Sequence, residues 1–344
     1  MPVSNALLDA GIASYREKRT GYTLNSGMME LREKVVRYHQ TPHYPTTKNV
    51  VVTIGATGGL FAALMAVGDP GDEILYFDPS FTNYPTAMTL AGLVPKPIRL
   101  ERDRSWALDL DAVAAAITPR TRALLLNSPS NPTGRIDSAA ELKALVELTE
   151  RSGIWLISDE VYRDIYFTPS APPSVGTLTD RAIVIRALSK SASMTGFRVG
   201  YVLAPDAIAT AVAAVHQFNV TCAPTLSQHL ALVAMGDPER YLTELLPAFK
   251  RQRAAMVEAV DRDLGMPFAS PQGGFFIFLD VRSLGMKSLE LSERLLSEAD
   301  VVTVPGIAFG ENGEGFLRLS FVASEADIAE GIGRIKSFVQ KLRA

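Results

Sequence analysis

Short apolar runs alternate with longer segments of helical periodicity along the first two thirds of the chain. The apolar runs predict strands at residues 50–54, 73–77, 123–127, 154–158, 182–186 and 200–203. Between them, apolar positions recur every three to four residues, as in 57–67 and 138–151, and this spacing predicts helices. Strands that alternate with helices are typical of βαβ units. The pattern therefore predicts an α/β fold whose mainly parallel sheet carries helices on both faces.

The pattern changes after residue 225. Later segments predict a long helix over 238–264, a glycine-rich strand at 273–278, a helix near 288–298, a strand at 316–321 and a closing helix from Glu325. These elements indicate a second, smaller α/β domain. We assign residues 45–245 to the large domain, and residues 1–44 together with 246–344 to the small one, because we expect the N-terminal segment to pack with the C-terminal elements.

Polar, glycine-rich and proline-rich residues follow five of the predicted strands. In an open parallel sheet, ligands bind outside the carboxyl ends of the strands. The segments at these positions are 55–57, 78–81, 127–134, 159–162 and 189–190. Such a coincidence rarely arises by chance, so these segments predict a binding site along one edge of the sheet.

Lys190 carries the most specific chemistry, since it follows a predicted strand and precedes Arg198 by eight residues. A lysine at a strand end can condense with a carbonyl cofactor as a Schiff base. A nearby arginine can hold an anion bidentately. This pair suits a phosphate-bearing aldehyde, of which pyridoxal 5′-phosphate (PLP) is the common example. Taken alone, a solvated surface lysine remains the alternative.

Other strand-end residues fit the same ligand, and each has an ordinary structural alternative. Asn131 can donate to a ligand oxygen, with a cis bond to Pro132, or belong to a loop with Asx turns. Asp159 ends a buried-looking strand, where it can keep a pyridinium nitrogen protonated or cap a helix. Tyr162 can reach a phenolic oxygen, and Phe81 can stack on an aromatic ring or join the core.

Two further positions suit anions. The backbone N–H groups of Gly55–Thr57 open a predicted helix, whose positive end favours phosphate. Arg318 lies on one face of a predicted strand with Phe316 and Ser320, where it can bind a substrate carboxylate or face solvent at a sheet edge.

Taken together and in this order, the motifs of the chain resemble the class I/II aminotransferase family of fold-type I PLP enzymes, from Tyr22 to the C-terminus. The matching stretches are Tyr-Thr-x-x-x-Gly-x-x-Glu-Leu-Arg (22–32), Gly-Ala-Thr (55–57), Asn-Pro-Thr-Gly (131–134), Ser-Asp-Glu-Val-Tyr (158–162), Ser-Lys (189–190), Gly-Phe-Arg-x-Gly-Tyr (196–201), Pro-x-Gly-Gly-Phe (271–275) and Arg-Leu-Ser (318–320).

The resemblance implies a role for each candidate. Lys190 would form the Schiff base and shuttle the proton, with Asp159 and Tyr162 as its catalytic partners. The remaining cofactor contacts would come from Tyr22, Ala56, Thr57, Phe81, Asn131, Ser189 and Arg198. Arg318, with Asn131, would bind the substrate. Tyr22 would reach the phosphate of the neighbouring subunit, so the resemblance implies a homodimer.

The chain departs from the family pattern in two places. Ala187 stands two residues before Ser189, where the family usually has a serine that contacts the phosphate. The chain also begins too late to contain the N-terminal arm with a Gly-x-Pro segment that usually covers the substrate.

We therefore expect a PLP-dependent aminotransferase that acts on an L-α-amino acid and a 2-oxo acid. A PLP-dependent β-eliminating lyase of the same fold is the alternative, but lyases of that group tend to have histidine in place of Tyr162. An acyltransferase of this fold typically stacks histidine where Phe81 stands. A non-enzymatic PLP-binding regulator would carry a DNA-binding domain before Tyr22.

The composition of the chain excludes some classes of partner and of location. The 344 residues are 47% hydrophobic and 21% charged, with a net charge of −3, which argues against a nucleic-acid or membrane-surface partner. No apolar run is long enough to span a bilayer, and the first residues show no secretory signal, so we expect a cytoplasmic protein. Cys222 is the single cysteine, and we expect it to be a packed apolar residue rather than a nucleophile. The four histidines show no metal-ligand spacing.

Overall fold

The larger of two sheets has seven strands in the order β1-β7-β6-β5-β4-β2-β3, in a computed structural model that describes residues 3–343. Its strands are β1 (Val50–Thr53), β2 (Glu73–Asp78), β3 (Val94–Arg99), β4 (Thr121–Asn127), β5 (Trp155–Asp159), β6 (Ala182–Ala187) and β7 (Gly200–Leu203). Only β7 runs antiparallel to its neighbours β1 and β6, whereas the other described pairs are parallel. The predicted mainly parallel sheet is confirmed.

Helices cover both faces of this sheet because successive strand residues point to opposite sides. In β4, Leu124 and Leu126 join an apolar cluster with α5 (Leu110–Ala116) and α6 (Ala139–Arg151). Their neighbour Leu125 joins a second cluster with α3 (Gly55–Val67), α4 (Asn83–Leu90) and α8 (Asp206–Val220). The two-sided burial explains why the strands read as continuous apolar runs.

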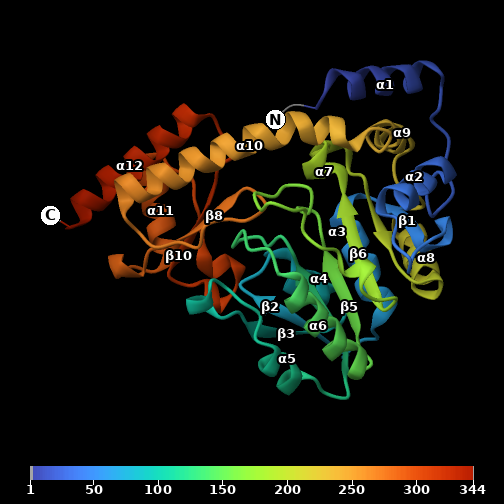
Figure 1. Ribbon diagram of the computed structural model, residues 1–344, viewed down its shortest axis with the longest axis horizontal. Coiled ribbons are helices and arrows are strands. Elements are labelled where there is room, and N and C mark those ends of the chain that lie inside the picture. The colour runs from blue at the N-terminus through green and yellow to red at the C-terminus, as the bar shows by residue number, and fades with distance from the viewer. Residues whose placement is uncertain (1–2, 344) are drawn as a thin grey trace.

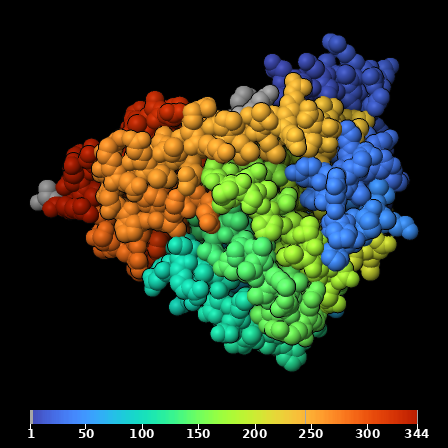
Figure 2. All heavy atoms as spheres, viewed as in Figure 1, coloured from blue at the N-terminus to red at the C-terminus, as the bar shows by residue number. Residues whose placement is uncertain are grey.

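A smaller antiparallel sheet, in the order β8-β10-β9, lies in the C-terminal part of the chain. Its strands are β8 (Phe276–Asp280), β9 (Val304–Pro305) and β10 (Phe316–Ser320), and its helices are α10 (Pro238–Ala259), α11 (Ser288–Ala299) and α12 (Glu325–Arg343). The long helix α10 runs along the upper border of the molecule and reaches from the larger unit to the smaller one (Figure 1, Figure 2).

The segment before β10 connects the smaller sheet to the ends of β2 and β3. Asn312 Nδ2 donates to the carbonyl oxygens of Asp78 and Leu100, at 3.0 Å each. Gly310 has φ +124°, and a Cβ at this position would collide with Asp78 Oδ1. The backbone of this segment therefore lies directly against the end of β2.

The N-terminal helices pack against the larger unit. Helix α1 (Asn5–Arg16) contacts α9 (Thr225–Ala234), and α2 (Met29–His39) contacts α9 and β1. Leu31 and Val35 of α2 belong to the apolar cluster of the larger sheet, and Arg32 Nε donates to Val50 O at 3.1 Å. Figure 1 shows α1 and α2 on the side of the molecule away from α11 and α12.

This packing differs from the expectation that residues 1–44 join the smaller domain. The reason is that the apolar faces of α1 and α2 find their partners on α9 and β1. The division of the chain into two domains, with boundaries at residues 44/45 and 245/246, stays a prediction. Within the described residues, no helix is both long and apolar enough to cross a membrane.

Candidate active site

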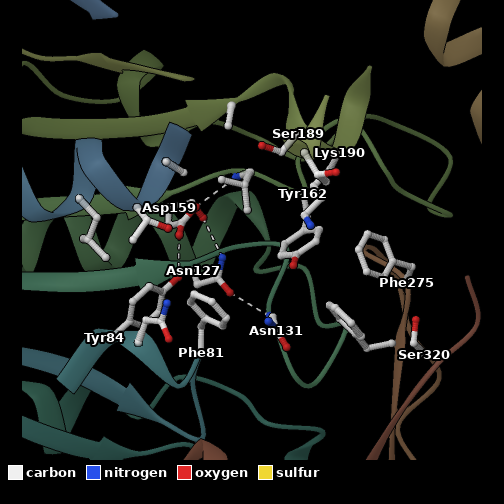
Figure 3. A pocket seen from close by; sticks show the side chains of 18 of the residues that line it. Phe81, Tyr84, Asn127, Asn131, Asp159, Tyr162, Ser189, Lys190, Phe275 and Ser320 are labelled. Carbon is white, nitrogen blue, oxygen red and sulfur yellow. Dashed lines mark hydrogen bonds between the residues drawn. The ribbon is translucent and has the colours of Figure 1, made fainter. Parts of the chain in front are cut away.

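The carboxyl ends of β1, β2, β4, β5 and β6 open into one cavity of about 460 Å³ (Figure 3). Ten of the predicted site residues line it: Ala56, Thr57, Phe81, Asn131, Asp159, Tyr162, Ser189, Lys190, Arg198 and Arg318. The remaining one, Tyr22, is 88% exposed and lies outside this cavity. The structure thus brings together groups that are spread over most of the chain.

Lys190 lies in the short helix α7 (Leu188–Ser191), which begins where β6 ends. Its side chain points toward the ring of Tyr162 (Figure 3), and its Nζ is 5.5 Å from the ring centre of Phe275. Burial lowers the pKa of Lys190, and the charges of Arg198 and Arg318 lower this pKa further. A larger share of the amine is then unprotonated, which is the form that attacks a carbonyl or accepts a proton.

Asp159 ends β5 and is 6% exposed. Its Oδ2 accepts a hydrogen bond from Tyr84 Oη at 2.8 Å, and its Oδ1 accepts one from Val161 N at 3.2 Å. Burial raises the pKa of Asp159 to about 6, although both hydrogen bonds oppose the rise. The carboxylate is therefore ionised near neutral pH, and a cationic ligand group beside it would be stabilised.

Two asparagines tie the end of β4 to the cavity. Asn127 Nδ2 donates to Asp159 O at 2.9 Å, and Asn127 Oδ1 accepts from Asn131 N at 2.8 Å. The peptide bond between Asn131 and Pro132 is cis, as predicted. Asn131 Oδ1 then accepts a hydrogen bond from Arg318 Nη1 at 3.0 Å. Asn127 and the loop after β4 thereby link the backbone carbonyl of Asp159, at the end of β5, to the guanidinium of Arg318 on β10.

Tyr162 is buried among aromatic side chains that come from the smaller sheet. Its ring meets those of Phe275 and Phe276 edge-on, with centroids 5.3 and 5.7 Å away. Burial and the nearby charge of Asp159 raise the pKa of Tyr162, while Arg318 and Asn131 oppose this rise. The hydroxyl therefore stays protonated and can donate a hydrogen bond into the cavity.

The start of α3 and Arg198 form a positively charged part of the cavity wall. Ala56 and Thr57 line the cavity in the first turn of α3, where backbone N–H groups lack helical partners. Arg198 Nη1 donates to Thr195 O at 2.8 Å. Gly55 has φ +72°, a conformation that favours glycine, and a Cβ there would come within 2.8 Å of Arg198 Nη2, which would have to shift. Free N–H groups, a helix dipole and a guanidinium suit a phosphate.

Arg318 projects from β10 between two aromatic rings. Its Cζ is 4.3 Å from the ring centre of Phe276 and 5.0 Å from that of Phe309. Among the described residues, its buried Nε has no hydrogen-bond partner. Burial lowers the pKa of Arg318. A half-buried guanidinium with a free, buried Nε is suited to an anion, and a carboxylate matches its planar fork.

Sequence reasoning gave no individual role to several residues of the cavity. They are Tyr84, Thr195, Phe275, Phe276 and Ser320, all of which line it, together with Asn127, which begins the predicted segment 127–134. Figure 3 shows Phe275 and Ser320 on the side of the smaller sheet, opposite Asp159 and Tyr84. Tyr84 follows Phe81 by three residues, and the hydrogen bond from Tyr84 N to Phe81 O, at 3.1 Å, closes a turn that brings the two rings together.

Comparison with known proteins gives consistent matches. Residues 3–335 match the family described as aminotransferase class I and II. A probable aspartate/prephenate aminotransferase of Aquifex aeolicus is 36% identical over 97% of this chain and 87% of its own length. An aspartate aminotransferase of Thermotoga maritima is 34% identical over 98% of this chain and 88% of its own. The crystal structure of an aromatic aminotransferase from Pyrococcus horikoshii superposes with a TM-score of 0.96 at 29% identity, covering 100% of this chain and 93% of that one.

Proposed function

The chain belongs to the class I and II aminotransferases, and from this premise we propose that it uses PLP to move an amino group between an L-α-amino acid and a 2-oxo acid. One observation carries the proposal. An amine of lowered pKa, a buried carboxylate and two arginines converge on a single cavity, in Lys190, Asp159, Arg198 and Arg318.

The donor set of the cavity fits PLP group by group. Lys190 would hold the aldehyde, and Asp159 would face the ring nitrogen. Asn131 and Tyr162 would hold the phenolic oxygen, and Phe81 would stack on the ring. The phosphate would be held by Arg198, Ala56, Thr57 and Ser189. When bound, the cofactor supplies an electron sink for the charge that remains after an amino acid loses its Cα proton.

The residues of the chain would supply binding and proton transfer. Arg318 would bind the α-carboxylate through its free Nε, which orients the Cα–H bond relative to Lys190. Lys190 Nζ would take the proton from Cα and return it to the cofactor side. Its lowered pKa favours this role because the amine must be unprotonated to act as the base.

The oligomeric state is a part of the proposal. In the single chain, Tyr22 is 88% exposed and Phe218 is 89% exposed. This exposure leaves the Tyr22 side chain accessible to a second subunit. We infer a homodimer in which Tyr22 completes the phosphate site of the neighbouring subunit.

Reductive labelling of Lys190 tests the cofactor assignment. Borohydride treatment of the PLP-loaded protein, followed by peptide mapping, should place the label on the peptide that contains Lys190. Lys190→Ala should lose the label and nearly all turnover, while Lys34→Ala should keep both. Lys34 is a suitable control because its Nζ donates to Leu232 O, at 3.0 Å, and the residue does not line the cavity. A label on any other lysine would refute the assignment.

A panel of amino acids tests the reaction and its side-chain preference. Each is mixed with the PLP-loaded protein, and the absorbance of the aldehyde and amine forms of the cofactor is followed. Aspartate and aromatic amino acids come first, because relatives are named for them. The amine form should appear with at least one amino acid, and a 2-oxo acid should reverse the change. No conversion with any member of the panel would contradict amino-group transfer.

A further inference from the structure

Tyr84 makes a buried hydrogen bond to the carboxylate that faces the cavity. Its hydroxyl lies 2.8 Å from Asp159 Oδ2 (Figure 3), and the two residues are 2% and 6% exposed. A tyrosine hydroxyl in this position needs a partner, because an unpaired buried polar group costs free energy. The bond therefore ties the orientation of the Asp159 side chain to the position of Tyr84.

The fold places Tyr84 for this contact. Tyr84 lies in the first turn of α4, after β2, while Asp159 ends β5, and β4 stands between these two strands. Tyr84 N donates to Phe81 O at 3.1 Å, and the two rings meet edge-on with centroids 5.6 Å apart. One turn of chain thus carries both the donor to Asp159 and the ring proposed to stack on the cofactor.

The direction of the hydrogen bond is fixed. Burial and the charge of Asp159 raise the pKa of Tyr84 well above its ordinary value, so the hydroxyl keeps its proton and donates. Val161 N donates to the other carboxylate oxygen. A carboxylate that accepts hydrogen bonds on both oxygens has a lower proton affinity than one that accepts a single bond.

We propose that Tyr84 is a positioning residue that keeps the Asp159 carboxylate ionised and directed at the ring nitrogen of the cofactor. The proposal rests on the proposed function, since it concerns the proton shared between Asp159 and that nitrogen. With the Tyr84 donor present, the carboxylate gives up the shared proton more readily, and the proton stays on the ring. Without it, the carboxylate becomes more basic and draws the proton toward itself.

Tyr84→Phe isolates this effect because it removes one oxygen and keeps the buried ring. Tyr44→Phe is the matched control. Tyr44 is also buried, at 1% exposed, and its hydroxyl donates to Ala182 O at 2.7 Å. Ala182 begins β6, at the end of the strand opposite to the cavity. Both variants lose a buried hydroxyl, but only Tyr84→Phe removes a donor from Asp159.

The decisive measurement is the ¹⁵N chemical shift of PLP labelled at its ring nitrogen and bound to each protein. The signal differs strongly between a protonated and a neutral pyridine nitrogen. In wild type and Tyr44→Phe we expect the protonated signal near neutral pH. In Tyr84→Phe we expect a displacement toward the neutral signal, equivalent to a tenfold or larger change in the proton partition, the scale of one hydrogen bond to a charged group.

Kinetics and cofactor binding supply a second readout. Tyr84→Phe should lower kcat about tenfold or more and leave KM for the amino acid nearly unchanged, because Arg318 is not altered. An unchanged ¹⁵N signal in a folded Tyr84→Phe variant that holds PLP would overturn the role of Tyr84 and leave the proposed function intact. A wild-type protein that does not hold PLP would instead overturn the proposed function, and the role of Tyr84 with it.

Discussion

Replacement of Arg318 tests how the chain recognises its substrate. In Arg318→Ala, the cavity loses the guanidinium whose buried Nε is free and whose Nη1 donates to Asn131. Amino acids that carry an α-carboxylate should then bind more weakly. PLP should bind almost as well as before, because Arg198 and the start of α3 are unchanged.

The expected loss of binding free energy follows from the environment of Arg318. Truncating one partner of a buried, hydrogen-bonded charge pair costs about 2–5 kcal/mol. Arg318 is half-buried and lies against the rings of Phe276 and Phe309, so water screens the pair only in part. We expect about 3 kcal/mol, which corresponds to a loss of roughly 150-fold in kcat/KM. The kcat/KM of Arg318→Lys should lie between those of the wild type and Arg318→Ala, because lysine keeps the charge but lacks the planar fork.

The assay compares an amino acid with the amine formed by its decarboxylation, using conversion of the bound cofactor to its amine form. Arg318→Ala should lose activity toward the amino acid while its activity toward the amine stays nearly constant. Arg253→Ala is the control, since Arg253 is also half-buried over an aromatic ring, 5.2 Å from the centre of Phe167, but lies outside the cavity. Equal losses toward both compounds, or equal reactivity of both with wild type, would refute the assignment.

Three further predictions concern the cofactor site. Burial raises the pKa of Asp159 from 3.8 to about 6. The contribution of this carboxyl to the stability of the cofactor-free protein is therefore fully present below pH 3.8, and about 3 kcal/mol of unfolding free energy is lost as the pH rises through 6. Asp159→Asn should therefore raise the melting temperature of the cofactor-free protein at pH 8 more than at pH 4, while abolishing turnover; an equal effect at both values would contradict the buried charge. If Tyr22 completes the neighbour's site, mixing Tyr22→Phe with inactive Lys190→Ala subunits should give activity above that of either variant, and a strictly monomeric active species in sedimentation would exclude this. Ala187 is 4% exposed and lines the cavity, so Ala187→Ser should add a donor to the phosphate and tighten PLP about three- to thirty-fold in equilibrium dialysis, with little change in turnover; equal or weaker retention would mean that Ala187 only packs.

Apolar runs predicted the central strands well because both faces of the sheet are buried. The strand β3 was missed, since Pro95 and Pro97 interrupt its pattern. Within residues 3–343, β3 is an edge strand whose one neighbour is β2, so the missing N–H groups cost little there. The antiparallel direction of β7 was also outside the prediction. The connection from β6 to β7, residues 188–199, holds only short helical turns and no long helix of the kind that usually carries a parallel crossover.

The strand-end rule located most of the candidate site, because the position of a residue just after a strand is visible in the sequence. The partners of these residues are not visible in this way. Tyr84 and Phe275 come from segments whose contact with Asp159 and Tyr162 depends on how distant elements pack. The packing of α1 and α2 has the same origin, since an apolar helix face does not specify which surface will cover it.

Gly310 lies outside the cavity, but its lack of a side chain bears on the surroundings of Arg318. A Cβ there would come within 2.0 Å of Asp78 Oδ1, so either the Asp78 side chain or the segment before β10 would have to move. Phe309, its neighbour in sequence, lies 5.0 Å from the guanidinium of Arg318, and its carbonyl oxygen accepts from Ser80 N at 2.9 Å. If Arg318 binds the substrate as proposed, a side chain at Gly310 would weaken substrate binding as well as the fold, because both depend on how this segment lies against the end of β2.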